Sequence, residues 1–280
     1  MNSQAPGEFI TVSGKKLHYK KAGSGPPVII LHGASGNFLD WTLSHFDALA
    51  REYTVLAFDR PGLGRSDAAD DNSLSAQADL MRKAATQLGL PKATIVGHSF
   101  GGSVALKWAL DAPEAVSGLV LLSAPSMVWP GSAGRLYDIA KIPVLGFALS
   151  QMVPYLANER RVNRAVEVIF APQPVAEGYL DHVEPDLSTR PQNFRNNAAQ
   201  VGALKAQMIE MVKDYDRLTM PIEVIHGTAD EIVPAEIHSI PFAREMRQAN
   251  LTLLEGIGHM PHHTSPDALF DALRRVTKDL

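Results

Sequence analysis

The chain has 280 residues, 45% of them hydrophobic and 20% charged, with a net charge of −4 and no cysteine. This length and apolar content suit one large core, so we expect a single α/β domain with an insertion rather than two independent domains. The mildly acidic balance excludes the basic surface that nucleic acid binding needs, and the lack of cysteine excludes disulfides, a thiol nucleophile and cysteine-ligated zinc. The amino-terminal segment has no basic stretch followed by an apolar one, so we predict no signal peptide and expect a cytoplasmic protein.

Short apolar runs alternate with helical patterns along most of the chain. A hairpin is predicted first, with strands at 9–12 and 17–20 around a Ser-Gly-Lys turn. Further strands are expected at 27–31, 53–58, 93–97, 117–122, 221–226 and 251–255, and helices at 38–50, 73–88, 99–111, 235–248 and 266–278. The alternation predicts an α/β fold with a mostly parallel eight-stranded sheet that carries helices on both faces.

The alternation stops between residues 126 and 216, where helical patterns occur without a convincing strand. We therefore expect a helical cap (126–216) inserted after the sixth strand, between the two parts of the α/β core (1–125 and 217–280). The most apolar piece of the cap, 142–155, has prolines near both ends and is too short to cross a bilayer, so no integral membrane insertion is expected. Its side chains either pack on the core or wall a pocket for an acyl group, and the candidates are Phe147, Leu149, Met152 and Val153.

Residues 94–102 read T-I-V-G-H-S-F-G-G, a β-branched run followed by a Gly-x-Ser-x-Gly turn. Taken alone, the turn also fits an ordinary glycine-rich corner. The apolar helical spacing that follows favours a nucleophile elbow, a tight strand-to-helix turn that exposes a reactive serine above the sheet. Ser99 is therefore the candidate nucleophile.

A serine hydroxyl is a weak nucleophile, so the chain must also supply a histidine base and a carboxylate that orients it. Asp230 lies in the loop after the strand at 221–226, and His259 lies in the glycine-flanked loop after the strand at 251–255. Glu231 is the alternative acid, but we expect its side chain to point away from the site. The predicted triad is Ser99, Asp230 and His259.

Four other histidines lie near these motifs. His262 and His263 follow His259 closely and can be read as part of a metal cluster, but no carboxylate or cysteine with a familiar ligand spacing accompanies them, so no metal is expected. His98 and His226 are interpreted as buried, hydrogen-bonded histidines beside the site.

Two backbone amides are the candidate donors to the oxyanion of a tetrahedral intermediate. Phe100 directly follows the nucleophile at the start of a helix, where free N–H groups and the helix dipole favour negative charge. Ala34 lies in the loop after the strand at 27–31, which is the second place for a preorganised donor.

Five motifs occur in order: L-H-G at 31–33, D-R-P-G-L-G-R-S-D at 59–67, G-H-S-F-G-G at 97–102, H-G-T-A-D at 226–230 and G-H-M-P at 258–261. Essentially the whole chain resembles the α/β-hydrolase superfamily, in the branch that contains lipases and esterases, meta-cleavage-product hydrolases, haloalkane dehalogenases and epoxide hydrolases. The resemblance implies the α/β-hydrolase fold and the chain order Ser, Asp, His for the triad. It does not specify the substrate, because this fold hosts many reactions.

Departures from that branch narrow the expected chemistry. Dehalogenases and epoxide hydrolases use an aspartate nucleophile, where this chain has Ser99. Meta-cleavage-product hydrolases typically carry a tryptophan after the catalytic histidine, where this chain has Met260. Four cap arginines either bind a substrate carboxylate or only solvate the surface: Arg160, Arg161, Arg164 and Arg195.

We therefore predict a serine hydrolase that cleaves carboxylic esters of small to medium apolar acids through an acyl-enzyme, without a cofactor. Its expected partner is a small-molecule ester. Two alternatives stay open: hydrolysis of a C–C bond of the meta-cleavage-product type, and a catalytically silent binding protein of the same fold. The natural substrate and the oligomeric state are not specified by the sequence.

Overall fold

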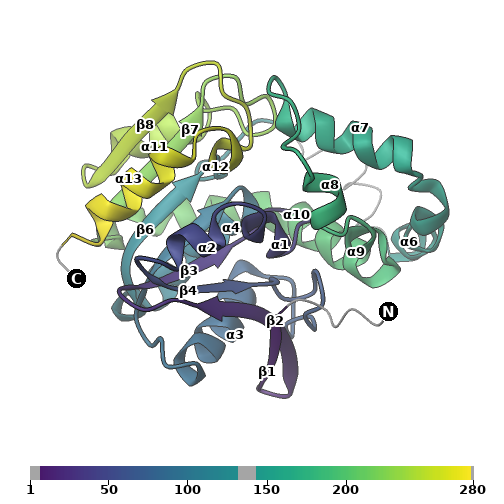
Figure 1. The fold of residues 1–280 in the computed structure, drawn as a ribbon, viewed down its shortest axis with the longest axis horizontal. Helices are drawn as coiled ribbons and strands as arrows, with labels where there is room; N and C mark the ends of the chain where they lie inside the picture. Colours follow the sequence, from purple (N-terminus) through teal and green to yellow (C-terminus); the bar gives the residue numbers. More distant parts are fainter. Residues whose placement is uncertain (1–6, 132–142, 279–280) are drawn as a thin grey trace.

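A single eight-stranded sheet forms the centre of the protein (Figure 1). The structure, a computed structural model, describes residues 7–131 and 143–278. The strand order is β1-β2-β4-β3-β5-β6-β7-β8; β1 and β2 pair antiparallel at one edge, and all strands from β4 to β8 in this order run parallel. The strands span Glu8–Val12, Lys15–Ala22, Pro27–Leu31, Thr54–Phe58, Ala93–His98, Val116–Leu122, Ile222–Gly227 and Ala249–Leu254, numbered β1 to β8 in chain order. The predicted α/β fold and its mostly parallel sheet are confirmed.

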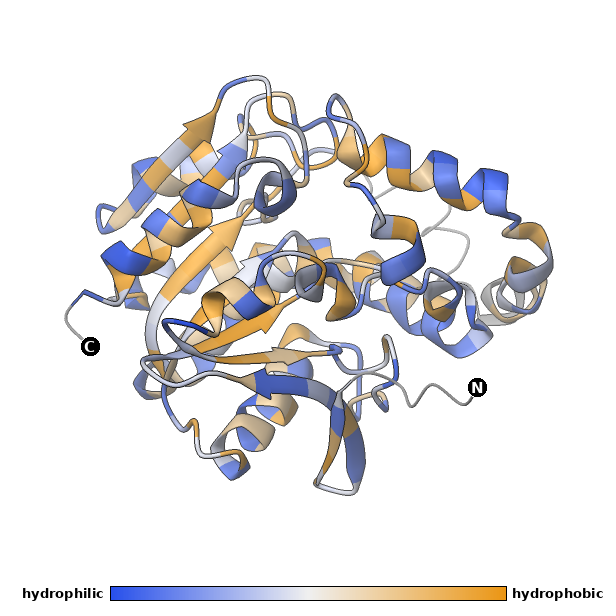
Figure 2. Cartoon of the chain, in the orientation of Figure 1, coloured by the Kyte–Doolittle hydropathy of each residue, from blue (hydrophilic) through white to orange (hydrophobic). Residues whose placement is uncertain are grey.

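Helices cover both faces of the sheet. One core cluster joins the strands to α3 (Leu74–Gln87), α4 (Phe100–Asp111) and α11 (Ser239–Glu245). A second cluster on the other face joins them to α1 (Leu39–Thr42), α2 (Phe46–Leu49) and α13 (Pro266–Val276). β5 and β7 are buried along their whole length, so neither shows the alternation of buried and exposed residues that a strand with one solvent-facing side has. Figure 2 shows the central strands mostly in orange and β2, the second strand from the edge, largely in blue.

The predicted helix over 38–50 is wrong in one respect, because α1 and α2 are separate four-residue helices. Polar side chains at the end of α1 and after it bond locally: the Thr42 hydroxyl donates to the Leu39 carbonyl, and Ser44 bonds to the His45 ring. Such bonds compete with continuation of a helix. The predicted helix over 235–248 is likewise shorter, because α11 spans only Ser239–Glu245.

Between β6 and β7 the chain forms the helical cap expected after the sixth strand. In the described part of this insertion the elements are α6 (Pro143–Leu156), α7 (Glu159–Phe170), α8 (Tyr179–His182), α9 (Asp186–Thr189), α10 (Pro191–Met211) and the 3-10 helix η2 (Val212–Arg217). In Figure 1, α6 to α9 form a lobe beside the sheet, and α10 leads back to the core. None of the helices in the described ranges is both long and apolar enough to cross a bilayer. The domain boundaries at 126 and 216 stay a prediction.

Candidate active site

Ser99 occupies the corner between β5 and α4. Its backbone has φ 51° and ψ −124°, a conformation that residues with a side chain rarely adopt. The corner is held by a hydrogen bond of 2.8 Å from the Ser99 N–H to the Leu122 carbonyl of the next strand. A side chain at Gly97 would come within 2.5 Å of the Gly101 carbonyl oxygen, and one at Gly101 would overlap the Leu31 carbonyl. The tight packing explains why the sequence has glycine on both sides of the serine.

The structure brings Ser99, His259 and Asp230 together. His259 Nε2 lies 3.0 Å from Ser99 Oγ, and His259 Nδ1 lies 2.7 Å from Asp230 Oδ2. The other carboxylate oxygen of Asp230 accepts the N–H groups of Ile232 and Val233, both at 2.9 Å. Burial raises the pKa of Asp230, but hydrogen bonds from His226 and His259 outweigh this and lower that pKa below its usual range. An ionised Asp230 therefore faces the imidazole.

The neighbouring residues also lie as the sequence predicts. Glu231 is exposed, whereas Asp230 is buried. His226 Nε2 lies 2.6 Å from the Val233 carbonyl and 3.2 Å from Asp230. His98 Nε2 bonds to the His259 carbonyl at 2.9 Å. His226 thus holds the loop that carries Asp230, and His98 holds the loop that carries His259.

The two predicted oxyanion donors flank the elbow. Phe100 is the first residue of α4, so its N–H has no partner inside the helix. The loop after β3 approaches the serine closely, because a Cβ placed on Gly33 would lie 3.2 Å from the Ser99 Cβ. Within the described ranges the N–H of Ala34, the next residue, makes no hydrogen bond. The pairing of these amides in an oxyanion hole stays a prediction.

The cap holds the loop that carries His259. The Gln173 side chain donates to the Gly256 carbonyl and accepts the Gly258 N–H, both at 2.8 Å. A side chain at Gly258 would overlap the Ala171 carbonyl at the end of α7. Nothing in the sequence around Gln173 indicates these two hydrogen bonds, because their partners Gly256 and Gly258 lie 83 and 85 residues further along the chain.

The four predicted acyl-binding residues lie on α6, which packs against α10 and α9. Phe147 and Met152 expose 56% and 54% of their surface, whereas Leu149 and Val153 are half-buried. No described contact joins these side chains to the triad, so their role in an acyl pocket stays a prediction.

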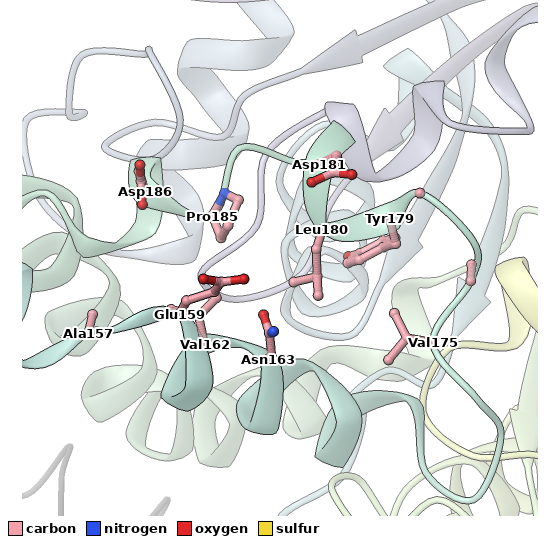
Figure 3. Close-up of a pocket in the computed structure, with 12 residues that line it drawn as sticks. Ala157, Glu159, Val162, Asn163, Val175, Tyr179, Leu180, Asp181, Pro185 and Asp186 are labelled. Atoms are coloured by element: carbon pink, nitrogen blue, oxygen red, sulfur yellow. The ribbon is translucent and has the colours of Figure 1, made fainter.

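An open pocket of about 580 Å³ lies within the cap, between α7 and the segment of α8 and α9 (Figure 3). Its apolar lining includes Val162, Val175 and Leu180, and its rim carries three carboxylates: Glu159, Asp181 and Asp186. Neither the triad nor the four α6 residues line this pocket. Tyr179 links it to the core, because its hydroxyl donates to Asp40 in α1 at 2.9 Å.

Asp40, His262 and His263 are the one group of described residues with the side chains and spacing to hold a metal ion. Asp40 accepts from His262 Nε2 at 3.0 Å and from His263 Nε2 at 2.9 Å. The sequence pattern around His262 does not indicate this carboxylate, because Asp40 lies 222 residues away.

The surroundings of this cluster favour a hydrogen-bond network over a metal site. A histidine that binds metal through Nε2 carries its proton on Nδ1 and normally donates it to a second partner. The Nδ1 atoms of His262 and His263 are buried and have no partner. Metal binding would leave two buried donors unpaired, at a cost of roughly 1–3 kcal/mol each.

Burial keeps several imidazoles neutral. It lowers the pKa of His32 to about 3 and the pKa values of three others to about 4: His45, His98 and His238. In the unfolded chain these groups bind a proton below about pH 6.5. Between about pH 6.5 and pH 4 the unfolded state therefore binds more protons than the folded state, and the free energy of unfolding falls as the pH falls.

We expect the melting temperature to be highest above about pH 6.5 and to fall steadily toward about pH 4, with each buried histidine contributing at most about 1.4 kcal/mol per pH unit. Thermal unfolding followed by circular dichroism across this range measures the slope. His45→Gln should make the slope shallower, because it removes one of these imidazoles. A melting temperature that does not change between about pH 7.5 and about pH 4.5 would contradict this account.

The sheet topology, the strained serine corner and the hydrogen-bonded order Ser99, His259, Asp230 define the class of an α/β hydrolase. Comparison with known families agrees: the profile of the alpha/beta hydrolase fold family matches residues 26–266. The chain belongs to this family and is a hydrolase of the α/β superfamily.

Relatives cover most of the chain. The chain is 30% identical over 281 residues to the uncharacterized protein Mb2734 of Mycobacterium bovis, which covers 96% of this chain and 80% of that protein. It is 27% identical over 251 residues to a 2-hydroxy-6-oxononadienedioate/2-hydroxy-6-oxononatrienedioate hydrolase of a Pseudomonas species, covering 87% of this chain and 85% of the relative.

Solved structures share the fold. The crystal structure of a meta-cleavage product hydrolase (CumD) superposes with a TM-score of 0.79 at 22% identity, covering 98% of each chain. The esterase RhEst1 of a Rhodococcus species gives a TM-score of 0.73 at 24% identity, again over 98% of each chain. One of these neighbours is named a meta-cleavage product hydrolase and the other an esterase, so the fold alone does not specify the substrate.

Proposed function

We propose that this protein is a serine hydrolase that cleaves carboxylic esters of small to medium apolar acids through an acyl-enzyme intermediate. The observation that carries the proposal is the chain of hydrogen bonds from Ser99 through His259 to Asp230. It lies just past the carboxyl ends of β5, β7 and β8, the edge where parallel sheets bind ligands.

In the first half of the reaction, Ser99 Oγ attacks the ester carbonyl carbon while His259 Nε2 takes its proton. Asp230 accepts the Nδ1–H of His259 and stabilises the imidazolium that forms. The carbonyl oxygen becomes an oxyanion, which the amides of Phe100 and Ala34 bind. Collapse breaks the bond to the alcohol oxygen, which receives the proton from His259.

In the second half, a water molecule attacks the acyl group on Ser99 and gives a proton to His259. The second tetrahedral oxyanion uses the same two amides. Its collapse releases the carboxylic acid and returns the proton to Ser99 Oγ. Atoms and charges balance without a cofactor, so a small-molecule ester and water are the only reactants.

The cap arginines support an ester over a substrate with its own carboxylate. Arg160 and Arg161 are exposed on α7, and Arg164 pairs with Glu167 at 3.1 Å. Arg195 lies over the Phe147 ring, 5.2 Å from its centre. The charges of Arg160, Arg161 and Arg164 thus face solvent or have a partner, as in ordinary surface solvation.

Hydrolysis of a C–C bond is the second candidate, supported by the 27% identity to the Pseudomonas hydrolase. A vinylogous 1,5-diketone with a carboxylate tests it directly, because cleavage removes the visible absorbance of the substrate. Turnover of this diketone that exceeds turnover of every ester in a panel would favour the second candidate.

A fluorophosphonate probe is expected to label Ser99, because the triad makes this hydroxyl far more nucleophilic than other serines. Labelling should be absent in Ser99→Ala, and kcat should fall by roughly 10⁴ or more in Ser99→Ala, His259→Ala and Asp230→Asn. Mass spectrometry of the labelled peptide and a p-nitrophenyl ester assay measure these effects.

Glu231→Gln is the matched control, because it removes the neighbouring carboxylate from an exposed side chain. It should change kcat by less than about threefold. Ester hydrolysis at the wild-type rate by Ser99→Ala would overturn the mechanism. Absence of both labelling and turnover in the wild type would instead favour a silent binding protein of this fold.

Catalytic efficiency is expected to rise from acetyl toward butyryl or hexanoyl esters and then to fall when the acyl pocket is full. Each methylene that becomes buried in the transition state contributes up to about 0.8 kcal/mol, a factor of roughly four. A series of p-nitrophenyl esters gives the profile.

Two variants on α6 test whether this helix forms the pocket. Met152→Asp should flatten the rise with chain length, whereas Tyr155→Asp, at an 89% exposed position, should not. A wild-type profile that falls from acetyl onward would contradict the apolar pocket.

A further inference from the structure

Arg60 is a completely buried guanidinium with no carboxylate partner among the described residues. It donates to the carbonyl oxygens of His32 at 2.9 Å and Gly33 at 3.0 Å, and to the side-chain oxygens of Gln77 at 2.6 Å and Gln200 at 3.0 Å. All four acceptors are neutral. Burial lowers the pKa of Arg60 only to about 9, so the group remains cationic at neutral pH.

Burial of an isolated charge is costly, because it removes the water that solvated the charge. The cost is reduced where an opposite charge lies or develops nearby. Hydrogen bonds to neutral carbonyls and amides satisfy the N–H groups but leave the positive charge uncompensated. The charge is therefore available to any negative charge that develops nearby, and the low polarity of the interior strengthens that interaction.

The contacts of Arg60 lead to both predicted oxyanion donors. The Gly33 carbonyl belongs to the same peptide unit as the Ala34 N–H, and in a trans peptide these two groups point in opposite directions. The guanidinium also lies over the Phe100 ring, 4.5 Å from its centre. Arg60 thus contacts the peptide unit that carries the Ala34 N–H and the side chain of Phe100.

His32 supports the same peptide unit. Its Nε2 accepts the backbone N–H of Arg60 at 2.9 Å. The ring proton is therefore on Nδ1, which donates to the Gly33 carbonyl at 2.8 Å. The Gly33 carbonyl therefore accepts from both Arg60 and His32. Two donors on a carbonyl polarise the peptide unit and strengthen its N–H as a donor.

We propose that Arg60 is a positioning residue for the oxyanion hole: it holds the Gly33–Ala34 peptide with its N–H directed at the substrate oxygen, and its uncompensated charge stabilises the oxyanion. The inference rests on the proposed serine hydrolase function. If Arg60 only linked the turn after β4 to α3 and α10, it would affect stability but not the energy of the transition state.

The test compares wild type with Arg60→Met and Arg60→Lys in the full chain. With p-nitrophenyl butyrate, Arg60→Met should lower kcat by roughly 10- to 100-fold and change KM by less than about threefold, because the lost interaction forms only in the transition state. Arg60→Lys keeps the charge but loses the forked hydrogen bonds, so its kcat should lie between the other two.

A second readout measures oxyanion binding directly. Butylboronic acid forms a tetrahedral, anionic adduct with an active-site serine, and its inhibition constant should rise in Arg60→Met by about the same factor as kcat falls. Butyramide, a neutral ground-state mimic, should bind with unchanged affinity. A role in stability alone would not separate these two inhibitors.

Arg65→Met is the matched control, because Arg65 lies in the same turn and pairs with Glu184 at 2.5 Å. It should leave kcat and boronate affinity unchanged. Equal kcat and boronate affinity in wild type and Arg60→Met would overturn the inference while the labelling of Ser99 keeps the proposed function. A wild type that neither reacts with fluorophosphonate nor binds boronate would overturn both.

If Arg60→Met does not fold, the same measurements on Arg60→Lys test the proposal. An Arg60→Lys enzyme with the kcat and boronate affinity of the wild type would show that the forked contacts to Gly33 have no catalytic effect. A selective loss of boronate affinity in this variant, with butyramide binding intact, would support the positioning role.

Discussion

The close approach of three backbone segments around Ser99 is the constraint on which the site depends. Leu31 of β3 pairs with Gly97 of β5, so the loop after β3 rises directly beside the serine corner. The corner itself leaves no space for a side chain at Gly97 or Gly101. Because the sheet places β3 and β5 side by side, the serine and both predicted oxyanion donors are positioned by the rigid core, and their geometry does not depend on a flexible loop.

The cap reaches the same region through polar contacts with the core loops. Asn196 and Gln200 of α10 donate to the carbonyls of Gly62 and Pro61 at 2.9 Å each, and Gln200 also accepts from Arg60. On the other side, Gln173 holds the loop of His259. Substitutions in the cap can therefore shift the loops that carry Arg60 and His259, which gives one physical reason why this fold hosts many reactions.

Local patterns in the sequence predicted the strands, the inserted cap and the serine corner, because each depends on neighbouring residues. The order of the motifs also predicted that Ser99, Asp230 and His259 meet at one edge of the sheet. The contact of Asp40 with His262 could not be predicted, since the two residues lie 222 positions apart and neither has a local signal. Such contacts depend on the packing of α1 against the carboxyl-terminal helices. The pocket in the cap was missed for the same reason, because its walls come from separate helices.

The charges around the site are arranged in the direction that the proposed ester cleavage requires. The negative charge of Asp230 lies behind His259, where positive charge develops when the imidazole takes the serine proton. The positive charge of Arg60 lies behind the β3 loop and over Phe100, where negative charge develops on the substrate oxygen. Both groups are buried and held by hydrogen bonds before the substrate arrives, so little reorganisation is needed during the reaction. Burial lowers the pKa of His98 to about 4, so this ring, which lies beside His259, adds no positive charge next to the base at neutral pH. In the proposed mechanism, the cost of burying Asp230 and Arg60 is therefore offset where the transition state develops the opposite charge.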